Sequence, residues 1–185
     1  MSNEVRIIAG QWRSRRIRFP SADQLRPTPD RVRETLFNWL QGEIEGARCL
    51  DLYAGSGALG FEAASRGARR VVTVERAARV CAALRQSCAA LGATQVEVIQ
   101  AEATRFLAGS GGPFDIVFLD PPYRRGHLVR CCRLLETRGW LADRAWIYLE
   151  AEAELPIETV SGHWQVLRSQ KSGDVGYHLC HRSVQ

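Results

Sequence analysis

Residues 114–123 join an apolar run to a short group of residues that could do chemistry. The run ends in Asp120-Pro121-Pro122-Tyr123. It is typical of a strand buried on both faces of a parallel sheet, and the prolines end it because neither can donate to a neighbouring strand. Asp120 would then lie at the carboxyl edge of the sheet, where ligands bind. A rigid acceptor beside an aromatic ring suits a flat molecule with an N–H donor, although a plain strand exit with proline turn chemistry stays open.

A glycine-rich loop follows a second expected strand, over residues 49–53. Gly55, Gly57 and Gly60 satisfy the G-x-G-x-x-G pattern of dinucleotide sites, and Glu75 ends the next expected strand. Glu75 could accept both hydroxyls of a ribose in a dinucleotide or in S-adenosylmethionine. The loop alone therefore predicts an adenosine-containing cofactor without saying which one.

Asp51, inside the strand before this loop, favours S-adenosylmethionine. A carboxylate would repel a pyrophosphate, whereas S-adenosylmethionine carries a cationic amine and a sulfonium and has no phosphate. Glycines stay useful because the backbone must come close to the methionine part. For Glu102, an adenine contact and a helix-start acid favoured by the dipole are both open. The cofactor-binding candidates are Asp51, Tyr53, Ala54, Gly55, Ser56, Gly57, Glu75, Arg76, Glu102, Ala103 and Asp120.

The strands and helices expected to carry these residues alternate along the chain. From residue 47 onward, expected strands and helices take turns, which predicts a parallel, doubly wound α/β sheet. Ser172-Gly173-Asp174 joins the last two strands and predicts an antiparallel hairpin at one edge. Strands are expected at 5–9, 15–19, 49–53, 71–75, 95–99, 114–119, 145–149, 163–170 and 175–182, and helices near 58–66, 77–91, 102–108 and 127–137. Another helix should follow Thr28 as N-cap and Pro29 as first helical residue.

The excess positive charge is confined to one end of the chain. Residues 1–33 carry a net charge of +5, which equals that of the whole chain. Such a basic arm suggests a polyanionic partner, although solvated surface charge is the alternative for any one residue. The RNA-binding candidates are Arg13, Arg15, Arg16, Arg18, Arg26, Arg31, Arg33, Arg124, Arg125 and Lys171.

Composition excludes several other classes. The 185 residues, with 45% hydrophobic and 24% charged residues, suit one globular domain with a real core. No apolar run is long enough to span a membrane, and no signal peptide is expected. The six cysteines form no C-x-x-C pair and the four histidines are scattered. We therefore expect reduced thiols in the cytoplasm, without a disulfide framework or a metal site.

Four segments resemble the small 16S rRNA guanine-N2 methyltransferases of the RsmD type, within the class I S-adenosylmethionine-dependent methyltransferases. The 26–37 segment, which contains Arg-Pro-Thr, is the most specific of them. Tyr53 stands where the general methyltransferase loop has a glycine, although an aromatic residue fits the closer family. The segments are 6–12, with Arg-Ile-Ile-Ala-Gly and Trp12; 26–37; 51–60 with 65–68; and 120–123.

The resemblance implies a Rossmann-like fold with a seven-stranded, mostly parallel sheet in the order 3-2-1-4-5-7-6, strand 7 antiparallel, helices on both faces and an N-terminal β-hairpin arm. It implies a single methyltransferase domain over 1–185, with the arm at 1–27 and the catalytic core at 28–185. It also implies methyl transfer from S-adenosylmethionine to the N2 amine of a guanine in 16S rRNA. The partner would be the small ribosomal subunit or its assembly intermediate, and the enzyme is expected to be a monomer.

In that reaction Asp120 and the Pro121 carbonyl would each accept one N–H bond of the amine. Pro122 would stiffen the turn and Tyr123 would stack on the guanine. Three alternatives remain: an adenine-N6 or cytosine-N4 nucleic-acid methyltransferase, a dinucleotide oxidoreductase, and a non-catalytic RNA-binding assembly factor. The chain has no spare length for the recognition domain that DNA methyltransferases usually carry, and the set Asp51, Glu75 and Asp120 argues against a non-catalytic factor.

Overall fold

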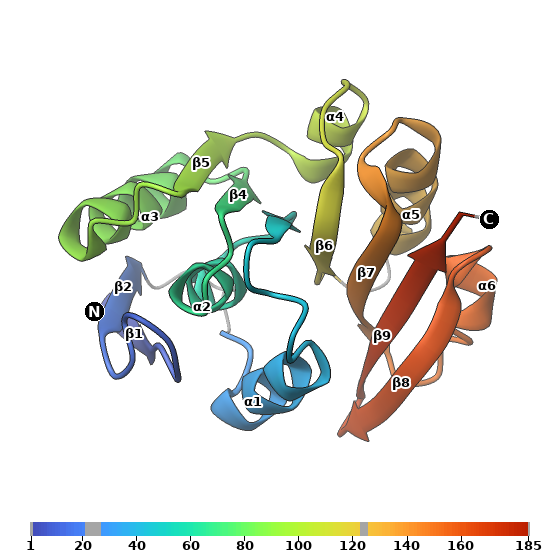
Figure 1. The fold of residues 1–185 in the computed structure, drawn as a ribbon, viewed down its shortest axis with the longest axis horizontal. Coiled ribbons are helices and arrows are strands. Elements are labelled where there is room, and N and C mark those ends of the chain that lie inside the picture. Colours follow the sequence, from blue (N-terminus) through green and yellow to red (C-terminus); the bar gives the residue numbers. More distant parts are fainter. Residues whose placement is uncertain (1, 21–26, 123–125, 185) are drawn as a thin grey trace.

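A seven-stranded sheet forms the centre of the computed structural model, which describes residues 2–20, 27–122 and 126–184. Its strands run in the order β5-β4-β3-β6-β7-β9-β8 (Figure 1). The first five are parallel, and β9 is antiparallel to both of its neighbours. This confirms the predicted order and the antiparallel last strand. The strands are β3 (Arg48–Asp51), β4 (Arg70–Glu75), β5 (Val96–Gln100), β6 (Phe114–Leu119), β7 (Leu141–Glu152), β8 (Gln165–Ser172) and β9 (Val175–Ser183).

Helices cover both faces of the sheet, so its central strands are apolar on both sides (Figure 1). One face packs on α1 (Asp30–Trp39), α2 (Ala58–Ser65) and α3 (Ala78–Leu91), together with the N-terminal hairpin. The other face packs on α4 (Ala103–Leu107), α5 (His127–Thr137) and α6 (Glu158–Ser161). Successive side chains of a strand point to opposite faces, so alternate residues of one strand enter different cores. None of the helices described is long and apolar enough to cross a membrane.

The N-terminal hairpin consists of β1 (Ser2–Arg6) and β2 (Arg16–Pro20), which pair antiparallel. The predicted first strand, over 5–9, was wrong in its bounds. The amides of Ile8 and Ala9 bond to the two carboxylate oxygens of Glu62, at 2.8 and 3.0 Å, and not to β2. The hairpin is therefore fixed to α2 by a side chain that the strand pattern does not reveal.

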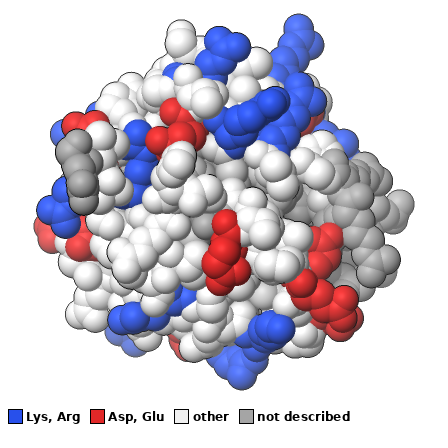
Figure 2. Space-filling view, turned by 90° about the vertical axis from the view of Figure 1, so that its right-hand side faces the viewer, with Lys and Arg blue, Asp and Glu red and all other residues white. Residues whose placement is uncertain are grey.

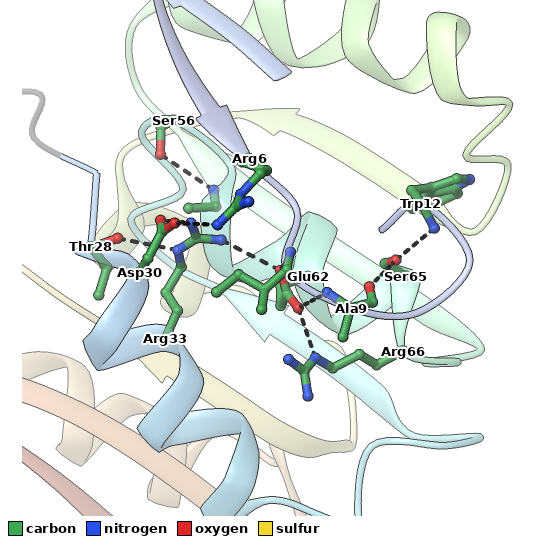
Figure 3. Close-up of polar contacts among 12 residues, drawn as sticks. Arg6, Ala9, Trp12, Thr28, Asp30, Arg33, Ser56, Glu62, Ser65 and Arg66 are labelled. Atoms are coloured by element: carbon green, nitrogen blue, oxygen red, sulfur yellow. Dashed lines mark hydrogen bonds and ion pairs between the residues drawn. The ribbon is translucent and has the colours of Figure 1, made fainter. Parts of the chain in front are cut away.

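Glu62 lies at the centre of a buried ionic cluster (Figure 3). Its carboxylate meets Arg66 Nε at 2.8 Å and Arg33 NH1 at 3.4 Å, besides the two hairpin amides. Arg33 also pairs with Asp30 and donates from Nε to the Thr28 carbonyl at 3.2 Å. We call Glu62, Arg33 and Arg66, with the amides of Ile8 and Ala9, the Glu62 cluster. It ties together the hairpin, α1 and α2.

Gly10 lets the hairpin approach α2 so closely. It has a φ of +83°, and a Cβ at this position would lie 1.9 Å from the Ser65 carbonyl oxygen. The same turn of chain is held by Ser65, whose Oγ donates to the Ala9 carbonyl at 2.6 Å and accepts from the Trp12 amide at 2.9 Å. The Trp12 side chain is buried in the core of this face. The basic hairpin thus shares the main hydrophobic core.

Two other predictions needed correction, and one helix was missed. Pro29, not Thr28, occupies the cap position of α1, because the Thr28 hydroxyl points to Glu150 at 3.5 Å instead of to the helix amides. β7 extends over Leu141–Glu152, well beyond the predicted 145–149, because Leu141 pairs with β6 and residues 144–152 pair with β9. The short helix α6 was not predicted.

Candidate active site

A cavity of about 810 Å³ opens at the carboxyl ends of β3, β4 and β6. It brings together every predicted cofactor-binding residue except Gly57. This is the edge at which parallel α/β sheets bind ligands, and β3 and β6 are the strands on either side of the point where the strand order reverses. The predicted residues that line it are Asp51, Tyr53, Ala54, Gly55, Ser56, Glu75, Arg76, Glu102, Ala103 and Asp120.

Glu75 holds the glycine loop in place through its carboxylate. It accepts the Gly55 amide at 3.2 Å and the Ala77 amide at 2.8 Å. Gly57 is buried and does not line the cavity; it caps α2 with a φ of +80°, and a Cβ there would lie 2.6 Å from Leu84. The expected cofactor contact by Gly57 is therefore corrected to a packing role, because the loop can reach α3 only without a side chain at this position.

Glu102 takes the helix-start role that its position left open. Its carboxylate caps α4, accepting the Arg105 amide at 2.9 Å and the Thr104 hydroxyl at 2.7 Å. Although burial raises the pKa of Glu102, these hydrogen bonds hold it below its usual value. The side chain still lines the cavity, so the capping role and a ligand contact are compatible.

Three carboxylates face the cavity from neighbouring strands: Asp51 on β3, Asp120 just after β6, and Glu150 on β7. Burial raises the pKa of Asp51 to about 7, although its Oδ2 accepts the Gly60 amide at 3.1 Å. Burial and the nearby charges of Glu150 and Asp51 raise the pKa of Asp120 well above its usual value. Along the described parts of the chain, no Arg or Lys forms a salt bridge with any of the three. Such acids favour a ligand that brings positive charge or N–H donors.

Glu150 was missed by the sequence analysis. Only 8% of the residue is exposed, and burial raises its pKa despite hydrogen bonds from Tyr148 and Thr28. A signal was available: Glu150 follows an apolar strand run over 145–149, as Asp120 follows 116–119 and Glu75 follows 71–74. Three parallel strands of the sheet, β4, β6 and β7, thus place a carboxylate at the same edge.

The predicted RNA-binding residues fall into two groups. Arg13, Arg15, Arg16, Arg18, Arg31 and Lys171 are exposed, and Arg16 and Arg18 share the carboxylate of Glu4. Arg33 was wrong as a phosphate contact. It is 0% exposed because its guanidinium is enclosed in the Glu62 cluster, where it fixes the Thr28 carbonyl beside the cavity.

Charge on the face at the right of Figure 1, formed by the C-terminal elements, is mixed. Figure 2 shows basic and acidic side chains interspersed there. Neither kind forms a continuous patch over the residues that the structure describes. The remaining predicted site residues, Tyr123, Arg26, Arg124 and Arg125, lie outside the residues that the structure describes.

The strand order and the helices on both faces of the sheet define a Rossmann-like fold. The family model "Conserved hypothetical protein 95" matches residues 5–181. The chain is 48% identical to ribosomal RNA small subunit methyltransferase D of Escherichia coli, over 100% of this chain and 93% of that protein. It is 42% identical to the protein of the same name from Haemophilus influenzae, over 95% and 93% of the two chains.

A solved structure supports the same family assignment. The Escherichia coli protein YhhF superposes with a TM-score of 0.91 at 48% identity, covering 99% of this chain and 100% of that one. The chain therefore belongs to the RsmD family of methyltransferases, as its four motif segments indicated.

Proposed function

We propose that this protein transfers a methyl group from S-adenosylmethionine to the exocyclic N2 amine of a guanine in 16S rRNA. The observation that carries the proposal is the juxtaposition of Asp120 and Pro121 with the acid-lined cavity at the switch point of the sheet. Relatives named as small-subunit rRNA methyltransferases support the substrate class. We further propose that 1–185 acts as one domain, as a monomer, in the cytoplasm where ribosomal subunits assemble.

The chemistry of the cavity fits S-adenosylmethionine better than a dinucleotide. Asp51 and Glu75 present carboxylates on either side of the glycine loop, which would repel a pyrophosphate and attract a cationic amine. We assign Asp51 to the amine end and Glu75 to the ribose hydroxyls. Glu102, Ala103 and the apolar side chains near them would hold the adenine. When bound, this cofactor supplies an electrophilic methyl group on a positively charged sulfur.

The residues of the chain would position the amine and accept its proton. Asp120 and the Pro121 carbonyl each accept one N–H bond, which turns the nitrogen lone pair toward the methyl group and brings the reactants into line. The N2 amine, held by Asp120 and the Pro121 carbonyl, would take up the methyl group that the bound cofactor supplies. The nitrogen then releases one proton. A raised pKa suits Asp120 to take it. Tyr123, outside the described residues, would stack on the base.

The exposed arginines of the hairpin would hold the RNA backbone. Arg13, Arg15, Arg16 and Arg18 lie on one hairpin whose position is fixed by the Glu62 cluster. Phosphate contacts of this kind give affinity and orientation without reading sequence. Arg31 and Lys171 extend the candidate surface, and Arg31 NH2 reaches the Ser172 hydroxyl at 3.5 Å.

Methyl transfer by Asp120→Ala to protein-free 16S rRNA and to small subunits tests the proposal. Modified nucleotides are mapped in both, and binding of S-adenosylhomocysteine is measured by thermal shift, with NAD as the competing ligand. We expect Asp120→Ala to lower kcat at least about 10²-fold while the thermal shift persists. Asp143→Asn, an exposed acid on β7, is the matched control and should behave as wild type. An Asp120→Ala enzyme with unimpaired transfer would refute the mechanism, and stabilisation by NAD alone would refute the cofactor.

A further inference from the structure

Glu150 is placed beside Asp120 by the pairing of β6 with β7. Leu119 pairs with Leu149, so the next residue of each strand, Asp120 and Glu150, lies side by side. Leu119 and Leu149 belong to the core on the α5 face, and alternation along a strand sends Asp120 and Glu150 to the opposite face. Glu150 therefore reaches the proposed acceptor amine from the neighbouring strand.

A second, smaller cavity adjoins this pair. It has a volume of about 180 Å³ and lies between Pro121-Pro122 and the end of β7. Glu150 and His127 line both cavities, as do the two prolines. A flat base in the smaller cavity would thus have Glu150 beside it and the cofactor cavity next to it. This is the arrangement that a flipped-out nucleotide requires.

The two oxygens of Glu150 have different surroundings. Oε1 accepts the Tyr148 hydroxyl at 2.8 Å and is 3.5 Å from the Thr28 hydroxyl. Across residues 2–20, 27–122 and 126–184, no group donates to Oε2. Glu150 lines both cavities, so a ligand bound there could donate a hydrogen bond to Oε2.

We infer that Glu150 determines the choice of base by accepting the N1–H of guanine at Oε2, next to the N2 amine held by Asp120. The inference rests on the proposed function and deepens it. Guanine carries two adjacent donors on this edge, N1–H and the N2 amine. Adenine and cytosine each place an unprotonated ring nitrogen beside the amine, and that nitrogen would face the Glu150 carboxylate without a hydrogen bond. A site built around a donor rejects analogues that lack it because its own acceptor is left unpaired.

Replacing the target guanine by 2,6-diaminopurine changes this contact together with the group at position 6, and comparing wild type with Glu150→Gln separates the two changes. Diaminopurine keeps the 2-amino group, but its N1 is an acceptor. We expect wild-type protein to methylate guanine-containing RNA at least about 100-fold more efficiently in kcat/KM. Glu150→Gln, whose amide can donate to an N1 acceptor, should lower transfer to guanine and reduce the guanine-to-diaminopurine ratio at least about 10-fold.

The ratio separates a specificity role from a structural one. A Glu150→Gln protein that loses both activities equally, or keeps the wild-type ratio, overturns the inference while leaving the proposed function intact. Wild-type protein that methylates no guanine, either in protein-free 16S rRNA or in small subunits, overturns the proposed function itself. Asp143→Asn, on the same strand, should keep the wild-type ratio, and binding of S-adenosylhomocysteine verifies that Glu150→Gln is folded.

Discussion

Glu62 and Asp51 are both acids buried on the same side of the sheet, and their surroundings are opposite. Glu62, 0% exposed, receives two arginines and two backbone amides. Asp51, 3% exposed, accepts the Gly60 amide and has Glu75 and Asp120 as its charged neighbours. A buried acid with its cations holds segments of the fold together, whereas a buried acid without them is a site prepared for a cationic ligand.

The difference also explains the behaviour of the basic arm. Part of its charge is taken up internally, because Arg33 completes the Glu62 cluster, while the arginines of β2 and the turn before it remain at the surface. Glu62 thus anchors the hairpin through two amides, Arg33 completes the cluster, and the other arginines face solvent. Net charge by itself does not distinguish these roles, but burial and ion pairing do.

Removing the carboxylate of Glu62, which is paired with two arginines, should have the largest effect on stability. Glu62→Ala leaves Arg33 buried beside Asp30 alone and takes the acceptor from two hairpin amides. We expect the free energy of unfolding to fall by about 3–5 kcal/mol in urea titrations. Glu97→Ala, which breaks an exposed pair with Arg70, should cost at most about 1 kcal/mol. Equal losses for the two variants would contradict the contrast.

Removing the charge of Asp51, which has no cationic partner among the described residues, should instead raise the free energy of unfolding. Asp51 has a raised pKa, so the folded protein binds a proton more tightly than the unfolded chain. The stability of ligand-free wild type should therefore fall as pH rises from about 4 to about 7 through this group. Asp51→Asn should be more stable than wild type at pH 8, by roughly 1–4 kcal/mol, and should lose this advantage at pH 4.

Unfolding of both proteins in urea at the two pH values measures this difference, and thermal shift with S-adenosylhomocysteine measures the cost to binding. Asp51→Asn should lose most of the ligand-induced shift. A variant less stable than wild type at pH 8, or one that keeps full ligand binding, would show that Asp51 belongs to the fold as Glu62 does.

The smallest effect concerns the arginines left at the surface. Arg13→Ala should weaken RNA binding evenly across sequences and reduce the slope of log affinity against log salt by about 0.7 on single-stranded RNA. Filter binding at several salt concentrations measures this slope. Arg70→Ala, exposed but outside the arm, is the control and should leave it unchanged. A salt response that is flat in the wild type would remove the proposed role of the arm.

Much of the fold and the site could be predicted from local sequence. The apolar strand runs, the Gly55–Gly60 loop and Asp51 predicted a ligand site at one sheet edge, where the structure has a cavity, because parallel strands must end together. The prediction for Arg33 as a phosphate contact was wrong, and Glu150 was missed. An arginine at the start of a helix is indistinguishable, in sequence, from one that reaches 29 residues ahead to Glu62. Glu150 ends an apolar run as Asp120 does, but only register shows that the two are neighbours.

Local sequence was enough to predict the order of strands and helices, the glycine loop after β3 and the Asp-Pro-Pro turn, since each follows from periodicity or backbone restriction within a few residues. Which buried acids are paired with cations and which are not became apparent only from the packing of the folded chain. That outcome depends on contacts between segments far apart in the chain, and on the burial that makes an unpaired carboxylate costly. Glu62 and Asp51 differ for that reason, and so do their roles.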